Sequence, residues 1–370
     1  MATITYLTRI EFDFGLAARL PAYCQELGIR RPLLVTDPGL TKLGLIDAIA
    51  QRFAEAPPIF DATPPNPTEA AVMAALALYR AEGCDGVLAV GGGSSMDLGK
   101  GVRLLAVHEP PLARYAAVEG GVARIKGPLP PMIAVPTTAG TGSEVGRGAV
   151  IILEDGRKVG ILSPVMLPSL AVCDPELTLG LPPQLTAATG MDALAHCLES
   201  FMSAAVNPPA DAIALEGLTR GYGALRTAVR DGGDRSARWD MMMASTEGAL
   251  SFQKGLGAVH SLSHPLGALP GLRLHHGTLN AVLLPAVLRF NRPAIGDKWK
   301  RLEAILGGPP DRQIATLNTD IGIPEGLSAM GVTRDLLPGI AQAALGDHCH
   351  ATNPREASQA DYEAILEESF

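Results

Sequence analysis

The fold is decided by residues 86–100, which read GVLAVGGGSSMDLGK. The first five residues form an unbroken apolar run, which indicates a strand buried on both faces. Three glycines and two serines follow and lead into a helical pattern. Glycines let the backbone approach a ligand closely, and the free N–H groups at the start of a helix favour phosphate oxygens. The spacing matches neither G-x-G-x-x-G nor a Walker A motif, so a plain strand-to-helix turn remains the alternative.

The same alternation of strand and helix continues on both sides of this stretch. Further strands are predicted at residues 31–36, 58–61 and 132–135, and helices at 40–54, 67–82 and 91–106. Residues 149–162, with the turn Glu154-Asp155-Gly156, predict a β-hairpin. Continuous apolar strands separated by helices indicate a parallel sheet with helices on both faces.

The strand signals stop after about Pro182. Helical segments rich in Ala, Leu and Met follow at 184–203, 208–228, 236–251, 257–267, 277–290 and 297–305. We therefore expect an α/β N-terminal domain with a parallel, Rossmann-like sheet over residues 1–181. An all-helical C-terminal domain is expected over residues 182–370. Ligands usually bind in a cleft between two such domains.

Composition limits the class of protein. Of 370 residues 47% are hydrophobic and 18% charged, which is typical of a folded chain rather than a disordered one. The formal charge of −8 argues against nucleic acid or an anionic membrane surface as partner. No apolar run approaches the roughly 18 residues of a membrane span. The five cysteines match no pairing motif, so together with the lack of a signal-peptide pattern they predict a cytoplasmic enzyme.

Two further segments point to a nucleotide ligand in the first half. Asp37 follows a predicted strand, where a carboxylate can accept hydrogen bonds from a ribose 2′-OH. Its alternative role is that of a turn residue before Pro38. Residues 136–144 read PTTAGTGSE and leave another predicted strand with four hydroxyls. This segment could hold a pyrophosphate or a nicotinamide, and a polar surface loop is its alternative.

Histidines are concentrated in the second half, which holds all of the eight except His108. Asp192 and His196 are four residues apart and so share one face of a helix, as do His260 and His264. With His276 they form a set that suits Zn²⁺ or Fe²⁺ better than Mg²⁺ or Ca²⁺. For any one of them alone, a hydrogen-bonded core histidine is the commoner case.

Other histidines are interpreted differently. We expect His275 to be a bystander, because His276 directly precedes the glycine. Residues 347–350, Asp-His-Cys-His, are interpreted as a loop or cleft edge, because adjacent residues rarely converge on one ion. A dinucleotide site on one domain and a metal site on the other imply hydride transfer. The metal would polarise an alcohol or carbonyl oxygen, and the nicotinamide would exchange the hydride.

Four motifs together resemble those of one enzyme family. They read Gly91-Gly92-Gly93-Ser94-x-x-Asp97-x-x-Lys100, Pro136-Thr137-Thr138-x-Gly140-Thr141-Gly142-Ser143-Glu144, Gly190-Met191-Asp192-Ala193-Leu194-x-His196 and His260-x-x-x-His264-Pro265-Leu266-Gly267. The chain resembles the iron-containing (group III) alcohol dehydrogenases, which have the dehydroquinate synthase-like fold. The resemblance extends through Asn353-Pro354-Arg355, near the end of the chain.

The resemblance implies roles for particular residues. The metal ligands would be Asp192, His196, His260 and His276. The cofactor contacts would be Asp37, Asn66, Gly92, Gly93, Ser94, Ser95, Thr137, Thr138, Thr141 and Lys158. His264 would be the catalytic residue, near the nicotinamide, in proton relay or positioning. The ligand set serves Fe²⁺ and also Zn²⁺, and Asp37 goes with NAD rather than NADP.

The substrate expected from this reasoning is a small alcohol or aldehyde, or a hydroxy acid. Arg147, Arg273 and Arg355 flank the motif segments, and one of them could bind a substrate carboxylate such as that of 4-hydroxybutyrate. Solvated or ion-paired arginines are the alternative. We further expect a homo-oligomer, with a dimer as the working hypothesis, and no nucleic-acid or membrane partner.

Other classes compete with this interpretation. A zinc glycerol dehydrogenase or a maleylacetate reductase would share the fold and cofactor and differ in metal or substrate. A dehydroquinate synthase-like lyase would use NAD only transiently, and would need more basic residues in the helical domain to hold a phosphorylated substrate. A nucleotide-binding regulator without catalysis would have no use for a four-ligand metal site.

Overall fold

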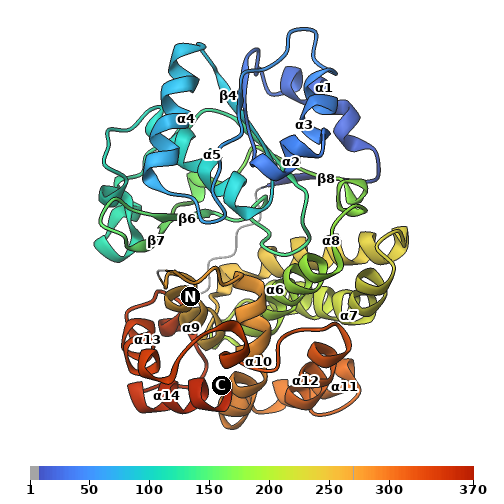
Figure 1. Cartoon of the computed structure of the whole chain (residues 1–370), viewed down its shortest axis with the longest axis vertical. Coiled ribbons are helices and arrows are strands. Elements are labelled where there is room, and N and C mark those ends of the chain that lie inside the picture. The colour runs from blue at the N-terminus through green and yellow to red at the C-terminus, as the bar shows by residue number, and fades with distance from the viewer. Residues whose placement is uncertain (1–7, 270) are drawn as a thin grey trace. The chain divides into compact units, whose positions relative to one another are not determined.

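A computed structural model describes residues 8–269 and 271–370. These residues separate into two compact units. The α/β unit comprises the described residues of 8–138 together with Ser143–Thr178, and the helical unit comprises Ala139–Gly142 and Leu179–Phe370. Each unit is considered by itself below (Figure 1).

A six-stranded parallel sheet forms the centre of the α/β unit, in the order β1-β8-β5-β4-β2-β3. The strands are β1 Arg9–Phe12, β2 Pro32–Val35, β3 Ile59–Phe60, β4 Gly86–Gly91, β5 Met132–Pro136 and β8 Leu170–Cys173. The predicted parallel sheet is thus confirmed. The strands β1 and β8 lay outside the predicted set.

Both faces of this sheet are covered, as the unbroken apolar runs predict. On β4, Val87 and Ala89 pack into a core with the helices α4 (Glu69–Ala81) and α5 (Gly93–Leu105). Leu88 and Val90 point the other way, into a second core with α1 (Leu20–Glu26) and α3 (Leu45–Ala50). Alternate residues of one strand therefore anchor helices on opposite faces.

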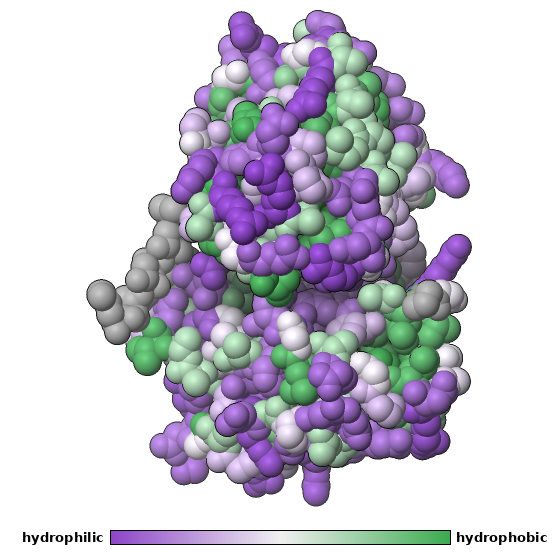
Figure 2. Space-filling model, turned by 90° about the vertical axis from the view of Figure 1, so that its left-hand side faces the viewer, coloured by the Kyte–Doolittle hydropathy of each residue, from purple (hydrophilic) through white to green (hydrophobic). Residues whose placement is uncertain are grey.

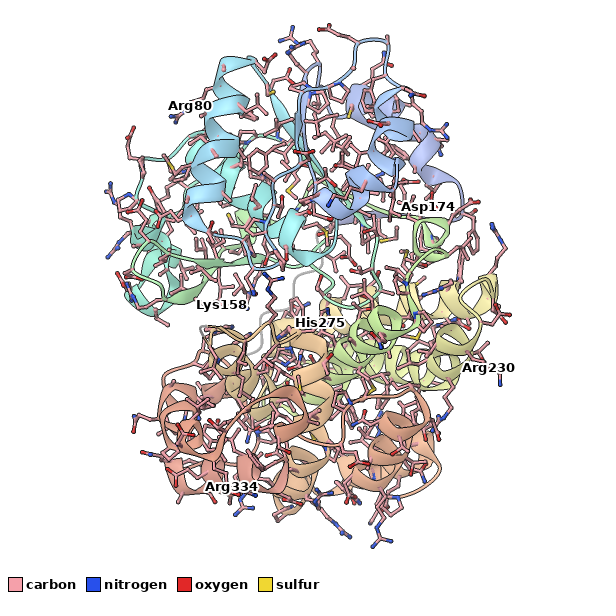
Figure 3. The ribbon with its side chains drawn as sticks, in the orientation of Figure 1. Arg80, Lys158, Asp174, Arg230, His275 and Arg334 are labelled. Atoms are coloured by element: carbon pink, nitrogen blue, oxygen red, sulfur yellow. The ribbon has the colours of Figure 1, made fainter. Side chains whose placement is uncertain are left out.

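Two local features of this unit bear on the predictions. The single helix predicted over 40–54 is two helices, α2 (Pro38–Lys42) and α3, because Gly44 between them has φ +73°. The predicted hairpin is confirmed as β6 (Gly148–Ile152) paired antiparallel with β7 (Lys158–Leu162). Asp174, labelled in Figure 3, follows β8 and accepts hydrogen bonds from the N–H groups of Gly15 and Ala17, which secures the chain after β1.

The helical unit consists of helices throughout, as predicted. They are α6 Pro183–Met202, α7 Pro208–Arg230, α8 Arg235–Ser251, α9 Ala258–Gly267, α10 His276–Asn291, α11 Asp297–Leu306, α12 Pro310–Asp320, α13 Leu337–Leu345 and α14 Gln359–Glu368. Helix α6 is buried over nearly all its length among α7, α8 and α10. The helices α12 to α14 lay outside the predicted set.

None of the helices within residues 8–269 and 271–370 combines the length and the apolar character needed to cross a membrane. Large hydrophobic side chains that are exposed, such as Leu43, Val107 and Val206, come from separate elements. On the face that Figure 2 presents, hydrophobic and hydrophilic residues are interspersed.

Candidate active site

Three helices of the helical unit bring four candidate metal ligands together. Asp192 and His196 lie one turn apart on α6, His260 lies on α9, and His276 is the first residue of α10. Ligand atoms of Asp192, His196 and His260 all lie within 4.8 Å of one another. His275, labelled in Figure 3, precedes α10 and is exposed, in keeping with a bystander.

Glycines allow α10 and α8 to approach α6 closely beside these ligands. A Cβ on Gly277, directly after His276, would lie 2.1 Å from the carbonyl oxygen of Ala188 on α6. A Cβ on Gly248 of α8 would lie 3.1 Å from Cβ of His196. Any side chain at Gly277 would therefore push α10, and His276 with it, away from the carboxylate of Asp192.

The geometry around Asp192 fits a metal ion. Nε2 of His196, His260 and His276 each lie 3.7 Å from Oδ1 of Asp192. This separation is too long for a hydrogen bond. It is close to the roughly 3.3–3.7 Å between two ligand atoms that are each about 2.0–2.2 Å from one ion. One carboxylate and three imidazoles are also a donor set that suits Fe²⁺ or Zn²⁺.

Neighbouring charges and burial shift the pKa values of these groups in opposite directions. Burial opposes ionisation of Asp192, but the neighbouring histidines outweigh it and hold the pKa of Asp192 below its usual range. Burial lowers the pKa of His196 to about 4, which keeps this imidazole neutral with a lone pair for a metal. Burial also acts to lower the pKa of His260, but Glu199 and Asp192 outweigh it and raise the value to about 9.

Two residues beside the cluster escaped the sequence reasoning. Glu199 accepts hydrogen bonds from the Val259 N–H at 2.8 Å and from Nδ1 of His260 at 2.5 Å, so it fixes that ring. Asn280 donates to Oδ1 of Asp192 at 2.7 Å, and its own Oδ1 is buried without a partner among the described residues. Their spacings, three residues after His196 and four after His276, are the signals that could have revealed them.

A second cluster surrounds His264. Its Nδ1 lies 2.8 Å from Oδ2 of Asp347, and its ring stacks on those of His276 and His348. Ligand-type atoms of His264, Asp347, His348 and Cys349 all lie within 4.8 Å of one another. Residues 347–349 lie in a loop, as predicted, and their ligand-type atoms nevertheless come together beside His264.

The convergence has a local cause. Oδ1 of Asp347 accepts the N–H of Cys349 at 2.8 Å, which folds the turn back on itself. Sγ of Cys349 then lies 3.4 Å from Nε2 of His348. His350, the next residue, points elsewhere and shares a hydrogen bond with the hydroxyl of Tyr362.

In the α/β unit, the glycine turn lies between β4 and α5 as predicted. Gly91 has φ +156°, and a Cβ there would lie 2.5 Å from Oγ of Ser95. Gly92 is the N-cap of α5, so the free N–H groups of the first helical turn follow it directly. Gly93 and Ser94 belong to that turn, and the hydroxyl of Ser94 donates to the carbonyl of Pro65.

Asp37 lies beside this turn. A Cβ on Gly91 would be 3.6 Å from Oδ2 of Asp37. Oδ1 of Asp37 accepts the N–H groups of Gly39 at 2.8 Å and Leu40 at 3.2 Å, so Asp37 also caps α2. The two roles weighed in the sequence are therefore compatible, because they use different oxygens of one carboxylate.

The hydroxyl segment after β5 is divided between the units. The N–H of Thr137 donates to the carbonyl of Gly91 at 3.0 Å, and Thr138 lies beside Gly92. Thr141 belongs to the helical unit. Lys158, at the start of β7 (Figure 3), donates to Oδ1 of Asn66 at 3.0 Å, so two residues expected to contact the cofactor are neighbours.

The buried Lys100 of α5 connects this helix to residues 143–148, which lead into β6. Its Nζ lies 2.7–2.9 Å from four oxygens, which belong to Ser143, Gly146 and Gly148. Its neighbour Asp97 accepts the hydroxyl of Ser143 at 2.6 Å and the N–H of Val150 at 2.9 Å. Both charged residues of this motif, Asp97 and Lys100, therefore hold the chain in place.

The three arginines considered for a substrate carboxylate have different surroundings. The guanidinium of Arg355 lies over the ring of Phe290 and donates to its carbonyl at 2.9 Å. Arg147 and Arg273 are exposed, the first in the α/β unit and the second in the helical unit. Arg355 therefore has a structural role, which leaves the other two as candidates.

Family models match both parts of the chain. The model described as iron-containing alcohol dehydrogenase matches residues 8–175. The model of the C-terminal part of the iron-containing alcohol dehydrogenase family matches residues 186–370.

Individual relatives are similar over nearly the full length. The 4-hydroxybutyrate dehydrogenase of Cupriavidus necator is 57% identical over 100% of both chains. The 1,3-propanediol dehydrogenase of Klebsiella pneumoniae is 39% identical over 94% of this chain and 93% of its own. Among solved structures, a 1,3-propanediol oxidoreductase superposes with a TM-score of 0.94 at 38% identity, over 100% of both chains. A sulfoacetaldehyde reductase from Bifidobacterium kashiwanohense in complex with NAD⁺ gives 0.89 at 27% identity, over 100% of this chain and 98% of its own.

Proposed function

The chain belongs to the iron-containing alcohol dehydrogenase family, and we propose that it interconverts an ω-hydroxy acid, of which 4-hydroxybutyrate is the type, with its aldehyde acid. The carrying observation is the identity of 57%, over the full length, with a 4-hydroxybutyrate dehydrogenase. A propanediol dehydrogenase reaches 39%, which makes 1,3-propanediol the second candidate substrate.

Asp192, His196, His260 and His276 hold Fe²⁺ in this proposal, and Zn²⁺ is the competing ion. Three Nε2 atoms at 3.7 Å from one oxygen of Asp192 support this assignment. When bound, the metal supplies a Lewis acid for the substrate oxygen. Glu199 holds the ring of His260 through Nδ1, so that Nε2 is directed towards Asp192.

The α/β unit holds NAD(H), which supplies the hydride acceptor or donor. The N–H groups after Gly92, with Gly93, Ser94 and Ser95, face the phosphates. The hydroxyls of Thr137 and Thr138, the helical unit's Thr141 and the Lys158–Asn66 pair supply further contacts. Oδ2 of Asp37 accepts the ribose 2′-OH, and its charge repels the 2′-phosphate of NADP.

His264 is the catalytic residue of this proposal. Nδ1 lies 2.8 Å from the carboxylate of Asp347, and the side chain of His264 is only 14% exposed. A hydrogen bond from Nδ1 to Asp347 leaves a lone pair on Nε2. Nε2 is then the atom that accepts or positions the proton of the substrate hydroxyl.

We further propose that the enzyme acts as a homodimer in the cytoplasm.

A substrate panel tests this proposal. We expect kcat/KM with NAD to be highest for 4-hydroxybutyrate, lower for 1,3-propanediol and lowest for 1-butanol. An arginine that pairs with the carboxylate gains charge-assisted hydrogen bonds, so its removal penalises the acid alone. We therefore expect Arg273→Ala or Arg147→Ala to lower kcat/KM for 4-hydroxybutyrate about tenfold, which is 1.4 kcal/mol, with 1-butanol unaffected. Arg355→Ala is the control, because Phe290 holds that side chain. A preference for butanol that neither variant alters would leave a general alcohol dehydrogenase.

A further inference from the structure

The turn after α13 gathers four side chains of ligand type around one point. His264 comes from α9, and Asp347, His348 and Cys349 are consecutive in the turn. Their ligand atoms lie within 4.8 Å of one another. The family reaction as proposed uses His264, with Asp347 as the partner of its Nδ1, so the side chains of His348 and Cys349 have no assigned task.

The distances within this cluster approach those of a metal site. Sγ of Cys349 and Nε2 of His348 are 3.4 Å apart. Tetrahedral coordination, with about 2.3 Å to sulfur and about 2.0 Å to nitrogen, places such atoms roughly 3.5 Å apart. Nδ1 of His264 and Oδ2 of Asp347, at 2.8 Å, would need to separate to roughly 3.3 Å on one ion.

Access and rigidity are both suitable. The side chain of His348 is 35% exposed, so an ion can enter past it, whereas those of His264 and Asp347 are 14% exposed. Cys349 is buried and held by the bond from its N–H to Asp347. The backbone of the turn is thus held before an ion arrives, which lowers the entropic cost of binding.

We propose that His264, Asp347, His348 and Cys349 form a second metal site, which takes thiophilic divalent ions such as Zn²⁺ or Cd²⁺. The thiol is the distinguishing donor, because the cluster around Asp192 offers only nitrogen and oxygen. Sulfur and imidazole together select Zn²⁺ and Cd²⁺ over Mg²⁺ and Ca²⁺.

An ion at this second site changes the state of His264. Its Nδ1 then binds the ion instead of the carboxylate of Asp347, and the ring is locked against the stacked His276, 5.5 Å away between centroids. If His264 has the role given under the proposed function, on which this consequence alone rests, the second site is inhibitory. Excess Zn²⁺ or Cd²⁺ then lowers kcat without displacing iron.

The experiment titrates Cd²⁺ into the iron-loaded, full-length protein. Total cadmium and iron are measured by elemental analysis, and the ultraviolet charge-transfer band reports the cadmium–thiolate bond. We expect one tightly bound Cd²⁺ per chain, a thiolate band of matching amplitude and unchanged iron. Cys349→Ser should abolish the band, and His348→Gln should weaken Cd²⁺ binding at least about tenfold.

Matched controls come from the same chain. His350→Gln alters a histidine of the same turn that bonds to Tyr362, and Cys84→Ser removes a thiol of the α/β unit. Both variants should keep the band and the affinity of the unaltered protein. A band that survives Cys349→Ser, or cadmium gained in proportion to iron lost, would overturn the second site. Absence of alcohol dehydrogenase activity before any cadmium is added would instead count against the proposed function.

Discussion

The candidate nucleotide site and the candidate metal site consist of different chemical groups. In the α/β unit, the turn from Gly91 to Ser95 offers mainly backbone N–H groups, and its geometry depends on the absence of a Cβ. In the helical unit, the site consists of side chains alone, delivered by α6, α9 and α10. A main-chain site is sensitive to added atoms, whereas a side-chain site is sensitive to removed ones. The predictions below use this difference, from the largest expected effect to the smallest.

Removing one carboxylate should eliminate the metal and spare the nucleotide. We expect Asp192→Ala to lose bound iron and to reduce kcat by about 10³-fold or more, which corresponds to several kcal/mol of lost transition-state stabilisation. The affinity for NADH, measured by fluorescence titration, should stay within about twofold, since every predicted nucleotide contact except Thr141 belongs to the α/β unit. Full iron content in this variant would remove Asp192 from the ligand set.

Adding one methyl group to the glycine turn should weaken nucleotide binding and leave the metal in place. The new Cβ of Gly91→Ala would lie 2.5 Å from Oγ of Ser95, so we expect a loss of about 1–3 kcal/mol in stability. NADH binding should weaken about tenfold, which is 1.4 kcal/mol, with unchanged iron content. Gly92→Ala is the control for stability, because its Cβ would meet Thr138 at an ordinary 3.5 Å. Equal melting temperatures for the two variants would contradict the steric argument.

The smallest effect concerns the choice between NAD and NADP. Asp37→Ser removes the charge that repels a 2′-phosphate and keeps an oxygen that can cap α2. We expect the ratio of kcat/KM for NAD over NADP to fall about tenfold, or 1.4 kcal/mol, at unchanged stability. Asp37→Ala should show the same fall and also lose about 1 kcal/mol of stability, because the N–H groups of Gly39 and Leu40 lose their acceptor. If Asp37→Ser left the ratio of kcat/KM for NAD over NADP unchanged, the carboxylate of Asp37 would have no part in the choice of cofactor.

Local patterns predicted much of the fold. The unbroken apolar run of β4 and the glycines after it were sufficient to predict the strand, the turn and α5. The long helices α6 to α8 followed from their apolar periodicity. The edge strand β1 and its neighbour β8 were not predicted, and their pairing joins distant parts of the chain. The break at Gly44 depends on a single positive φ.

The sequence revealed candidate ligands more readily than what holds them. The i,i+4 spacing of Asp192 and His196 is a property of one helix, so it is visible without a structure. The contact of Glu199 with His260 joins residues 61 apart in the chain, and that of Asp347 with His264 joins residues 83 apart. Such contacts depend on how helices pack. The proximity of Asp347 and Cys349 likewise depends on a local fold, because a side-chain hydrogen bond to the backbone turns the chain there.

The ammonium of Lys100 has a consequence for the motions of the α/β unit. Lys100 lies in the middle of α5, and its Nζ is within 2.9 Å of oxygens from Ser143, Gly146 and Gly148, where the chain enters β6. Segments without regular structure usually open independently of the core. If residues 143–148 opened alone, the buried ammonium of Lys100 would lose its hydrogen-bond acceptors. We therefore expect this segment and α5 to unfold together, in one step. Residues 143–148 and α5 should therefore unfold as one cooperative unit. The backbone amide hydrogens of both should exchange with solvent at the same slow rate.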